Sequence, residues 1–95
     1  MRLVWTPRAR RARAAVIDHV AQDNPKAALT QLDEIDRQTS RLVDHPAVGR
    51  PGRLGGTREL VINRTPFILV YRIDGDTISI LHCLHGAQQW PQGTM

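Results

Sequence analysis

The chain has 95 residues, enough for one small domain spanning residues 1–95 and a single core. A hydrophobic fraction of 41% argues against a disordered protein. The 13 Lys and Arg residues outnumber the 9 Asp and Glu residues, for a net charge of +4, and every cation except Lys26 is an arginine. Arginine pairs with phosphates and carboxylates in a bidentate way, so the excess favours an anionic partner, although arginine-rich solvated surfaces are an equal alternative.

Several classes of site are excluded by the residue types. Cys83 is the single cysteine, which rules out an intrachain disulfide and a cysteine-based zinc site. The histidines show no metal-ligand spacing, and no cofactor motif is present, so we expect neither metal nor cofactor. No apolar run approaches the roughly 20 residues needed to cross a membrane, and no secretory signal is visible, which predicts a cytoplasmic protein without membrane contact.

The first half of the chain predicts a short strand followed by two helices. Residues 2–5 are β-like, and Thr6-Pro7 is typical of a helix start, with Thr6 as the cap. Apolar residues recur at helical spacing to about residue 22. Asn24-Pro25 then starts a second helix that runs to about residue 43, and so short a break predicts a helical hairpin.

The first helix carries an unusual charge pattern. Four arginines crowd its first two turns: Arg8, Arg10, Arg11 and Arg13. This placement opposes the helix dipole, which favours acidic groups there. We therefore expect these cations to serve solubility or a partner rather than the helix.

The second half predicts a loop and three strands. Residues 44–56 hold four glycines and two prolines, which predicts a connector without regular structure. Residues 57–63, 66–73 and 76–84 are β-like, and Asp74-Gly75 between the last two predicts a tight hairpin. The order β-α-α-β-β-β predicts an α+β domain with a helical hairpin packed on one face of an antiparallel sheet.

A two-residue turn at Asp74-Gly75 predicts the strand register and the two faces of the sheet. Tyr71 would oppose Ile78, Leu69 would oppose Ile80, and Phe67 would oppose His82, all on the face covered by the helices. The other face would carry Cys83, His85, Glu59 and Arg72 as a candidate working surface, with a cross-strand ion pair as the favoured role of Glu59 and Arg72.

The candidate binding residues are mostly arginines of the glycine-rich connector and the strands that follow it. Glycines let the backbone approach a ligand, and arginines bind phosphate or an acidic peptide, which indicates an anion- or partner-binding set: Arg50, Arg53, Arg58 and Arg72. The alternative is a flexible connector with solvated cations. His85 could serve as a general acid or base or simply pack. Trp90 is expected to cap the sheet, with base stacking as the alternative.

Fragments along the whole chain give a family resemblance. They are Trp5-Thr6-Pro7, Asp23-Asn24-Pro25 with Ala27-Ala28, Gly49-Arg50, Thr57-Arg58-Glu59-Leu60, Val70-Tyr71-Arg72-Ile73, Leu84-His85-Gly86 and Trp90-Pro91. In this order and spacing the chain resembles the RelE/ParE toxins, small proteins encoded beside an antitoxin. The resemblance implies a co-encoded antitoxin as partner, and either DNA gyrase (ParE-like) or the ribosome with its mRNA (RelE-like) as target.

The residues favour the ParE-like alternative. The lysines expected near the second strand of RelE-like nucleases are missing, and Ala87-Gln88-Gln89 stands where a cation is expected. Arg64 and His85 match the nuclease pattern and would be catalytic only in a nuclease. We therefore expect a growth-arresting gyrase inhibitor, with a ribosome-dependent mRNA endonuclease as the alternative and a non-toxic, antitoxin-binding paralogue as a third.

Overall fold

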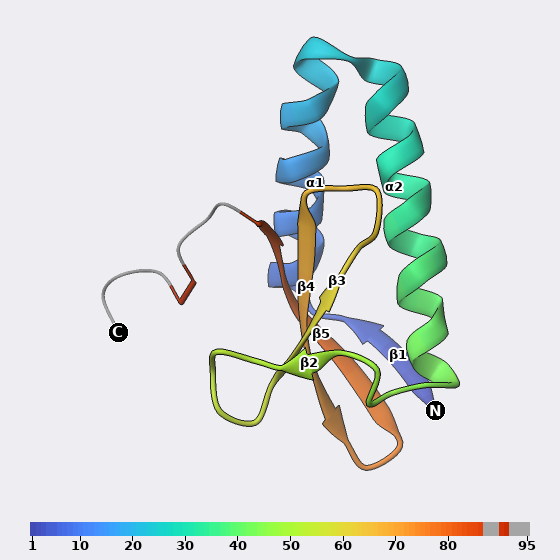
Figure 1. Cartoon of the computed structure of the whole chain (residues 1–95), viewed down its shortest axis with the longest axis vertical. Coiled ribbons are helices and arrows are strands. Elements are labelled where there is room, and N and C mark those ends of the chain that lie inside the picture. Colours follow the sequence, from blue (N-terminus) through green and yellow to red (C-terminus); the bar gives the residue numbers. More distant parts are fainter. Residues whose placement is uncertain (87–89, 92–95) are drawn as a thin grey trace.

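The computed structural model describes residues 1–86 and 90–91 as a helical hairpin on a curved sheet (Figure 1). The elements, in chain order, are β1 (Arg2–Trp5), α1 (Pro7–Asp23), α2 (Pro25–Ser40), the 3-10 helix η1 (Arg41–Val43), β2 (Arg50–Pro51), β3 (Arg58–Val61), β4 (Phe67–Asp74) and β5 (Thr77–His85). None of the described helices is long and apolar enough to span a membrane.

Both helices begin directly after the predicted capping residues, Thr6 and Asn24. The Thr6 hydroxyl accepts a hydrogen bond from the Ala9 amide at 3.1 Å, and the Asn24 side chain accepts one from the Ala27 amide at 3.0 Å. A proline fills the first position of each helix, where no amide donor is needed. Each cap satisfies an otherwise unpaired amide and contributes about 1 kcal/mol to helix stability.

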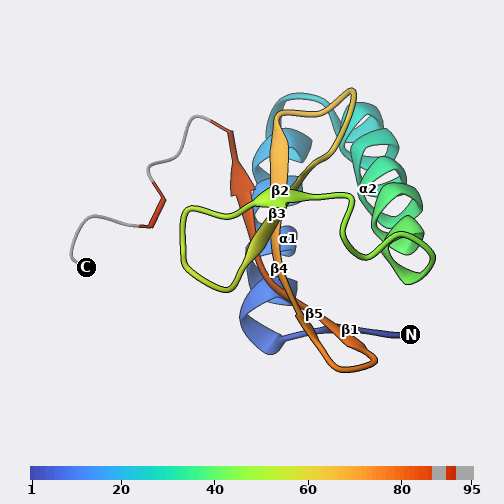
Figure 2. The same cartoon turned by 60° about the horizontal axis from the view of Figure 1, so that its bottom comes forward.

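The sheet has five strands in the order β1-β5-β4-β3-β2. β3, β4 and β5 pair antiparallel, as predicted, while β1 joins β5 in parallel at one edge, so the sheet is mixed. The predicted α+β fold is confirmed. The connector is not wholly irregular, however, because Arg50 and Pro51 form the short edge strand β2 against β3. Figure 2 shows β2 beside β3, where it pairs with the first two residues of that strand at the edge opposite β1.

The predicted register of the last hairpin was wrong. Asp74 pairs with Thr77, so Gly75 (φ 58°) and Asp76 form the turn and Tyr71 pairs with Ile80. A bulge then lets Val70 pair with His82, which leaves Leu81 as the extra residue. Because of this extra residue, the side chains of β5 beyond Leu81 lie on the faces opposite to those predicted.

The exchange moves three side chains whose placement was predicted. Cys83 and His85 pair with Leu69 and Phe67 and share their face, towards the helices, whereas His82 lies on the opposite face beside Val70. Cys83 is buried in the main core, and burial raises the pKa of its thiol to about 12.

The main core lies between the helical hairpin and the sheet. Its buried residues are Ala9, Ile35, Leu42, Ile62, Phe67, Leu69, Tyr71, Ile78, Ile80 and Cys83. A smaller cluster lies on the opposite face, where Leu81 and Trp90 pack against Ile68, Val70 and Leu84. Trp90 therefore caps the sheet, as expected.

Candidate functional site

The glycine-rich connector is organised around the carboxylate of Glu59. This side chain is only 1% exposed, and it accepts bonds from Arg50 Nη2 at 3.1 Å, Arg53 Nε at 3.1 Å, Arg53 Nη2 at 3.2 Å and the Arg53 amide at 2.9 Å. Burial alone would raise the pKa of Glu59, but these hydrogen bonds hold it below its ordinary value. Arg50 and Arg53 therefore fold the connector onto β3, although their guanidinium groups stay about half exposed.

The start of the connector is held by a second set of contacts. Arg58 Nη1 donates to the carbonyls of Ala47 at 3.3 Å and Gly49 at 2.8 Å. The buried Tyr71 hydroxyl donates to the Pro46 carbonyl at 2.7 Å and accepts from the Gly49 amide at 2.9 Å. A side chain at position 49 would meet that hydroxyl at 2.6 Å, so the close approach requires glycine. The connector is thus anchored rather than flexible.

Arg72 is engaged elsewhere. Its Nε donates to Asp74 Oδ2 at 2.8 Å, with both side chains about half exposed. The predicted ion pair between Glu59 and Arg72 is therefore wrong, because Glu59 turns to the connector. Of the predicted set, Arg50, Arg53 and Arg58 come together around the connector and Arg72 does not.

The two residues proposed for a nuclease lie near the β3–β4 turn: Arg64 is in that turn, and His85 pairs with Phe67 at the start of β4. Arg64, in the β3–β4 turn, binds Glu34 of α2 through Nε at 3.2 Å and Nη2 at 3.0 Å. Hydrogen bonds from Gln38 and Arg37, with a further one from Arg64, lower the pKa of Glu34 to about 2.

The His85 ring packs edge-on against Phe67, with centroids 6.3 Å apart. Arg64 and His85 line two separate pockets that share Gln31, whose Oε1 is buried without a hydrogen-bond partner.

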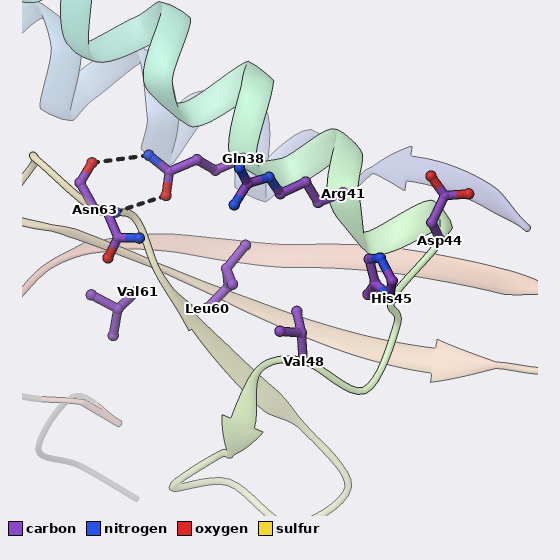
Figure 3. A pocket seen from close by; sticks show the side chains of 8 residues that line it. All are labelled: Gln38, Arg41, Asp44, His45, Val48, Leu60, Val61 and Asn63. Carbon is purple, nitrogen blue, oxygen red and sulfur yellow. Dashed lines mark hydrogen bonds between the residues drawn. The ribbon is translucent and has the colours of Figure 1, made fainter.

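A groove of about 420 Å³ separates the end of α2 from β3 (Figure 3). Gln38 closes one end by accepting from the Asn63 amide at 2.8 Å and donating to the Asn63 carbonyl at 2.9 Å. Val48 and Val61, exposed large hydrophobic residues, line the groove together with Leu60, and Arg41, Asp44 and His45 also line it. Such a surface can hold a peptide segment.

The cations at the start of α1 differ from those of the connector. Arg13 binds Asp36 at 3.2 Å and lies over the Trp5 ring at 4.3 Å. Arg8, Arg10 and Arg11 are exposed, and none of them has an ion pair within residues 1–86 and 90–91. These arginines stand out in the sequence because they oppose the helix dipole, but that pattern alone does not place them at a site.

His82 and Trp90 form a stacked pair on the face of the sheet away from the helical hairpin. Their ring centroids are 4.9 Å apart, and both His82 Nδ1 and Trp90 Nε1 are buried without a hydrogen-bond partner. Burial, and secondarily the charge of Arg8, lower the pKa of His82. The pair was not predicted because only the bulge places His82 on this face.

Each arginine of the predicted set is engaged within the fold. Among residues 1–86 and 90–91, no group of three or more potential metal ligands occurs. A small basic α+β domain with a helical hairpin on a five-stranded sheet has the fold of the RelE/ParE toxins.

Comparison with known proteins identifies the family. The family described as "ParE toxin of type II toxin-antitoxin system, parDE" matches residues 3–90, and the chain belongs to it. It is 42% identical over 91 residues to a protein of Sinorhizobium fredii (strain NBRC 101917 / NGR234) named "Putative toxin Y4kP", covering 96% of this chain and 94% of that one. The toxin component of a type II toxin–antitoxin system is therefore the class of this protein.

Solved structures support the same assignment. The chromosomal ParDE toxin–antitoxin system from P. aeruginosa contains a chain that is 33% identical, with a TM-score of 0.81 over 90% of this chain and 95% of that chain. The YoeB dimer from Staphylococcus aureus matches with a TM-score of 0.54 and 19% identity over 87% of this chain and 93% of that one, which shows a shared fold.

Proposed function

We propose that this ParE-family toxin arrests growth by binding and inhibiting DNA gyrase, without catalysing a reaction, and that a co-encoded antitoxin neutralises it. The observation that carries the proposal is the state of the two nuclease candidates: Arg64 is held by Glu34 and His85 packs against Phe67. Neither side chain is presented as a group that could work on an RNA phosphate.

A nuclease needs cations that face the scissile phosphate and stay free to stabilise the charge that develops there. Arg64 would have to leave a bidentate carboxylate before it could bind a phosphate. The single lysine, Lys26, lies at the start of α2, and Ala87-Gln88-Gln89 supplies no cation after Gly86. A protein that acts by binding has no need of these groups.

The antitoxin partner follows from the family and from the surface. The matched ParDE system pairs such a toxin with an antitoxin. The exposed arginines of α1 and the apolar groove beside β3 suit an acidic segment with apolar side chains, which orders on binding.

The test is DNA supercoiling by purified gyrase in the presence of the purified toxin. We expect supercoiling to be blocked, and we expect the block to disappear when the antitoxin is added first. Induction of the toxin alone should arrest growth with a DNA-damage response. Normal supercoiling at saturating toxin would refute gyrase as the target, and normal growth would indicate a non-toxic paralogue.

A ribosome-dependent mRNA endonuclease is the second candidate. It is favoured by one observation, that Arg64 and His85 line pockets on either side of Gln31 near the hairpin tip. Primer extension on mRNA from programmed ribosomes would then show cuts in the A site. Those cuts should vanish in Arg64→Ala and His85→Ala, and intact message removes this candidate.

A further inference from the structure

A mostly apolar pocket of about 350 Å³ lies where the start of α1 meets the face of the sheet that carries Trp90. Leu81, Val70 and Trp90 line it from the sheet side, Thr6 and Arg8 from the start of α1, and Leu54 from the connector. Its volume is in the range of pockets that hold a small ligand or a large side chain. The connector contacts described above hold Arg53, the neighbour of Leu54, so this part of the pocket is preformed.

Arg8 and Trp90, which line this pocket, and His82, which packs against Trp90, each carry a polar group without an ion-pair or hydrogen-bond partner among the described residues. Arg8 is exposed and has no ion pair among the described residues. Trp90 Nε1 is a buried donor without an acceptor, and the stacked His82 has a buried Nδ1 without a hydrogen bond. An unpaired buried donor costs about 1–3 kcal/mol, so an acceptor that reaches it is favoured. A cation and an unpaired N–H beside apolar walls suit a ligand that carries both an anionic oxygen and an apolar group.

We propose that this pocket is a docking site for an acidic peptide segment, which inserts an aliphatic side chain between Leu54, Leu81 and Val70 and places a carboxylate against Arg8. The partner's carboxylate or a backbone carbonyl accepts the Trp90 N–H. This assignment rests on the proposed function, in which the segment belongs to the antitoxin.

A peptide fits these observations better than a nucleic acid. One face of the Trp90 ring is taken by His82, at 4.9 Å between centroids, and the ring packs against the small cluster of Ile68, Val70 and Leu84. Base stacking needs an exposed aromatic face. The remaining walls are aliphatic, and these match an aliphatic side chain. The other exposed cations nearby, Arg10 and Arg11, extend the positive charge that attracts an acidic segment.

The experiment measures the affinity of the purified full-length antitoxin for the toxin and for three single variants. Arg8→Ala removes the cation, and Trp90→Phe removes the indole N–H while it keeps an aromatic ring. Arg2→Ala removes an exposed arginine of β1 that lines neither this pocket nor the groove beside β3. Circular dichroism and thermal unfolding establish that each variant is folded, and a variant that unfolds is replaced by Arg8→Gln or Leu81→Val.

We expect Arg8→Ala to raise Kd about tenfold or more, as loss of a charge-assisted hydrogen bond does. We expect a rise of severalfold for Trp90→Phe and a change within about twofold for Arg2→Ala, whose charge contributes mainly to encounter. Equal affinities of the wild type, Arg8→Ala and Trp90→Phe would overturn the pocket assignment and leave the toxin–antitoxin pairing intact.

Two other outcomes overturn the proposal differently. If the antitoxin does not bind the wild-type toxin, the proposed function fails together with the pocket assignment. If a single-stranded oligonucleotide binds and Arg8→Ala abolishes that binding, while antitoxin affinity stays unchanged, the pocket is a nucleic-acid site and the peptide is refuted.

Discussion

The arginines of the connector and those at the start of α1 differ in what surrounds them. Arg50 and Arg53 share one buried carboxylate, and Arg58 donates to two backbone carbonyls, so these cations build the connector. Arg8, Arg10 and Arg11 have no such anchor among the described residues and face solvent. The comparison teaches that a basic composition does not locate a binding site: a cation beside a buried acid is a structural element, and a cation without one is free for a partner.

The largest expected effect comes from removing the anchor of the connector. Glu59→Gln replaces an acceptor oxygen with an N–H₂ group that faces guanidinium donors, in a side chain that is 1% exposed. We expect a loss of about 1.5–3 kcal/mol in the free energy of unfolding, the range for hydrogen bonds to charged groups, measured by urea denaturation. Asp74→Asn makes the same chemical change at an exposed ion pair and should cost less than about 1 kcal/mol. Equal losses in the two variants would contradict the structural role of the connector arginines.

A smaller effect is expected from the acid that anchors Arg64. The pKa of Glu34 is about 2 in the folded protein and 4.5 by its ordinary value. A depressed folded pKa stabilises the protein fully above pH 4.5, and this stabilisation is lost as the pH falls towards 2. We expect the free energy of unfolding to fall over that window, and to fall less steeply in Glu34→Gln; Glu59, whose pKa is also lowered, keeps part of the slope. A variant with an unchanged pH profile would show that Glu34 is not held as an ionised acceptor by Gln38, Arg37 and Arg64.

The smallest effect on stability is expected at the unanchored cations. Arg10→Ala and Arg11→Ala remove no ion pair and should change the free energy of unfolding by less than about 0.5 kcal/mol. Together they should slow antitoxin association, and more so at low salt, because exposed charges act mainly on the rate of encounter. Stopped-flow association at two salt concentrations measures this. A loss of stability comparable to that of Glu59→Gln would remove the distinction between the two groups of arginines.

Features that depend on local sequence were predictable. Thr6-Pro7 and Asn24-Pro25 set both helix starts because a cap needs only the residues around it. The faces of the last hairpin were not predictable beyond Ile80. The bulge at Leu81 arises from packing between two strands, and the alternating pattern of Leu81, His82, Cys83 and Leu84 fits either face.

The candidate site was predicted only in part for a similar reason. The connector was recognised as a place where arginines gather, but whether a guanidinium is free depends on which acid reaches it. Glu59 and Arg72 are both on strands and were expected to pair. Because residues 50–53 fold back onto β3, Arg50 and Arg53 bind Glu59 in place of Arg72. No local sequence pattern predicts these contacts.

The double hydrogen bond between Gln38 and the backbone of Asn63 limits which residues position 38 tolerates. A carboxylate could accept from the Asn63 amide but could not donate to its carbonyl, and an ammonium group could donate but not accept. A shorter amide at the same site would not span the gap between α2 and β3. Gln38 is 4% exposed, so water would not easily replace either bond. Among variants selected for function, this position should therefore be among the least permissive of the second helix, for a reason separate from its place at the end of the groove beside β3.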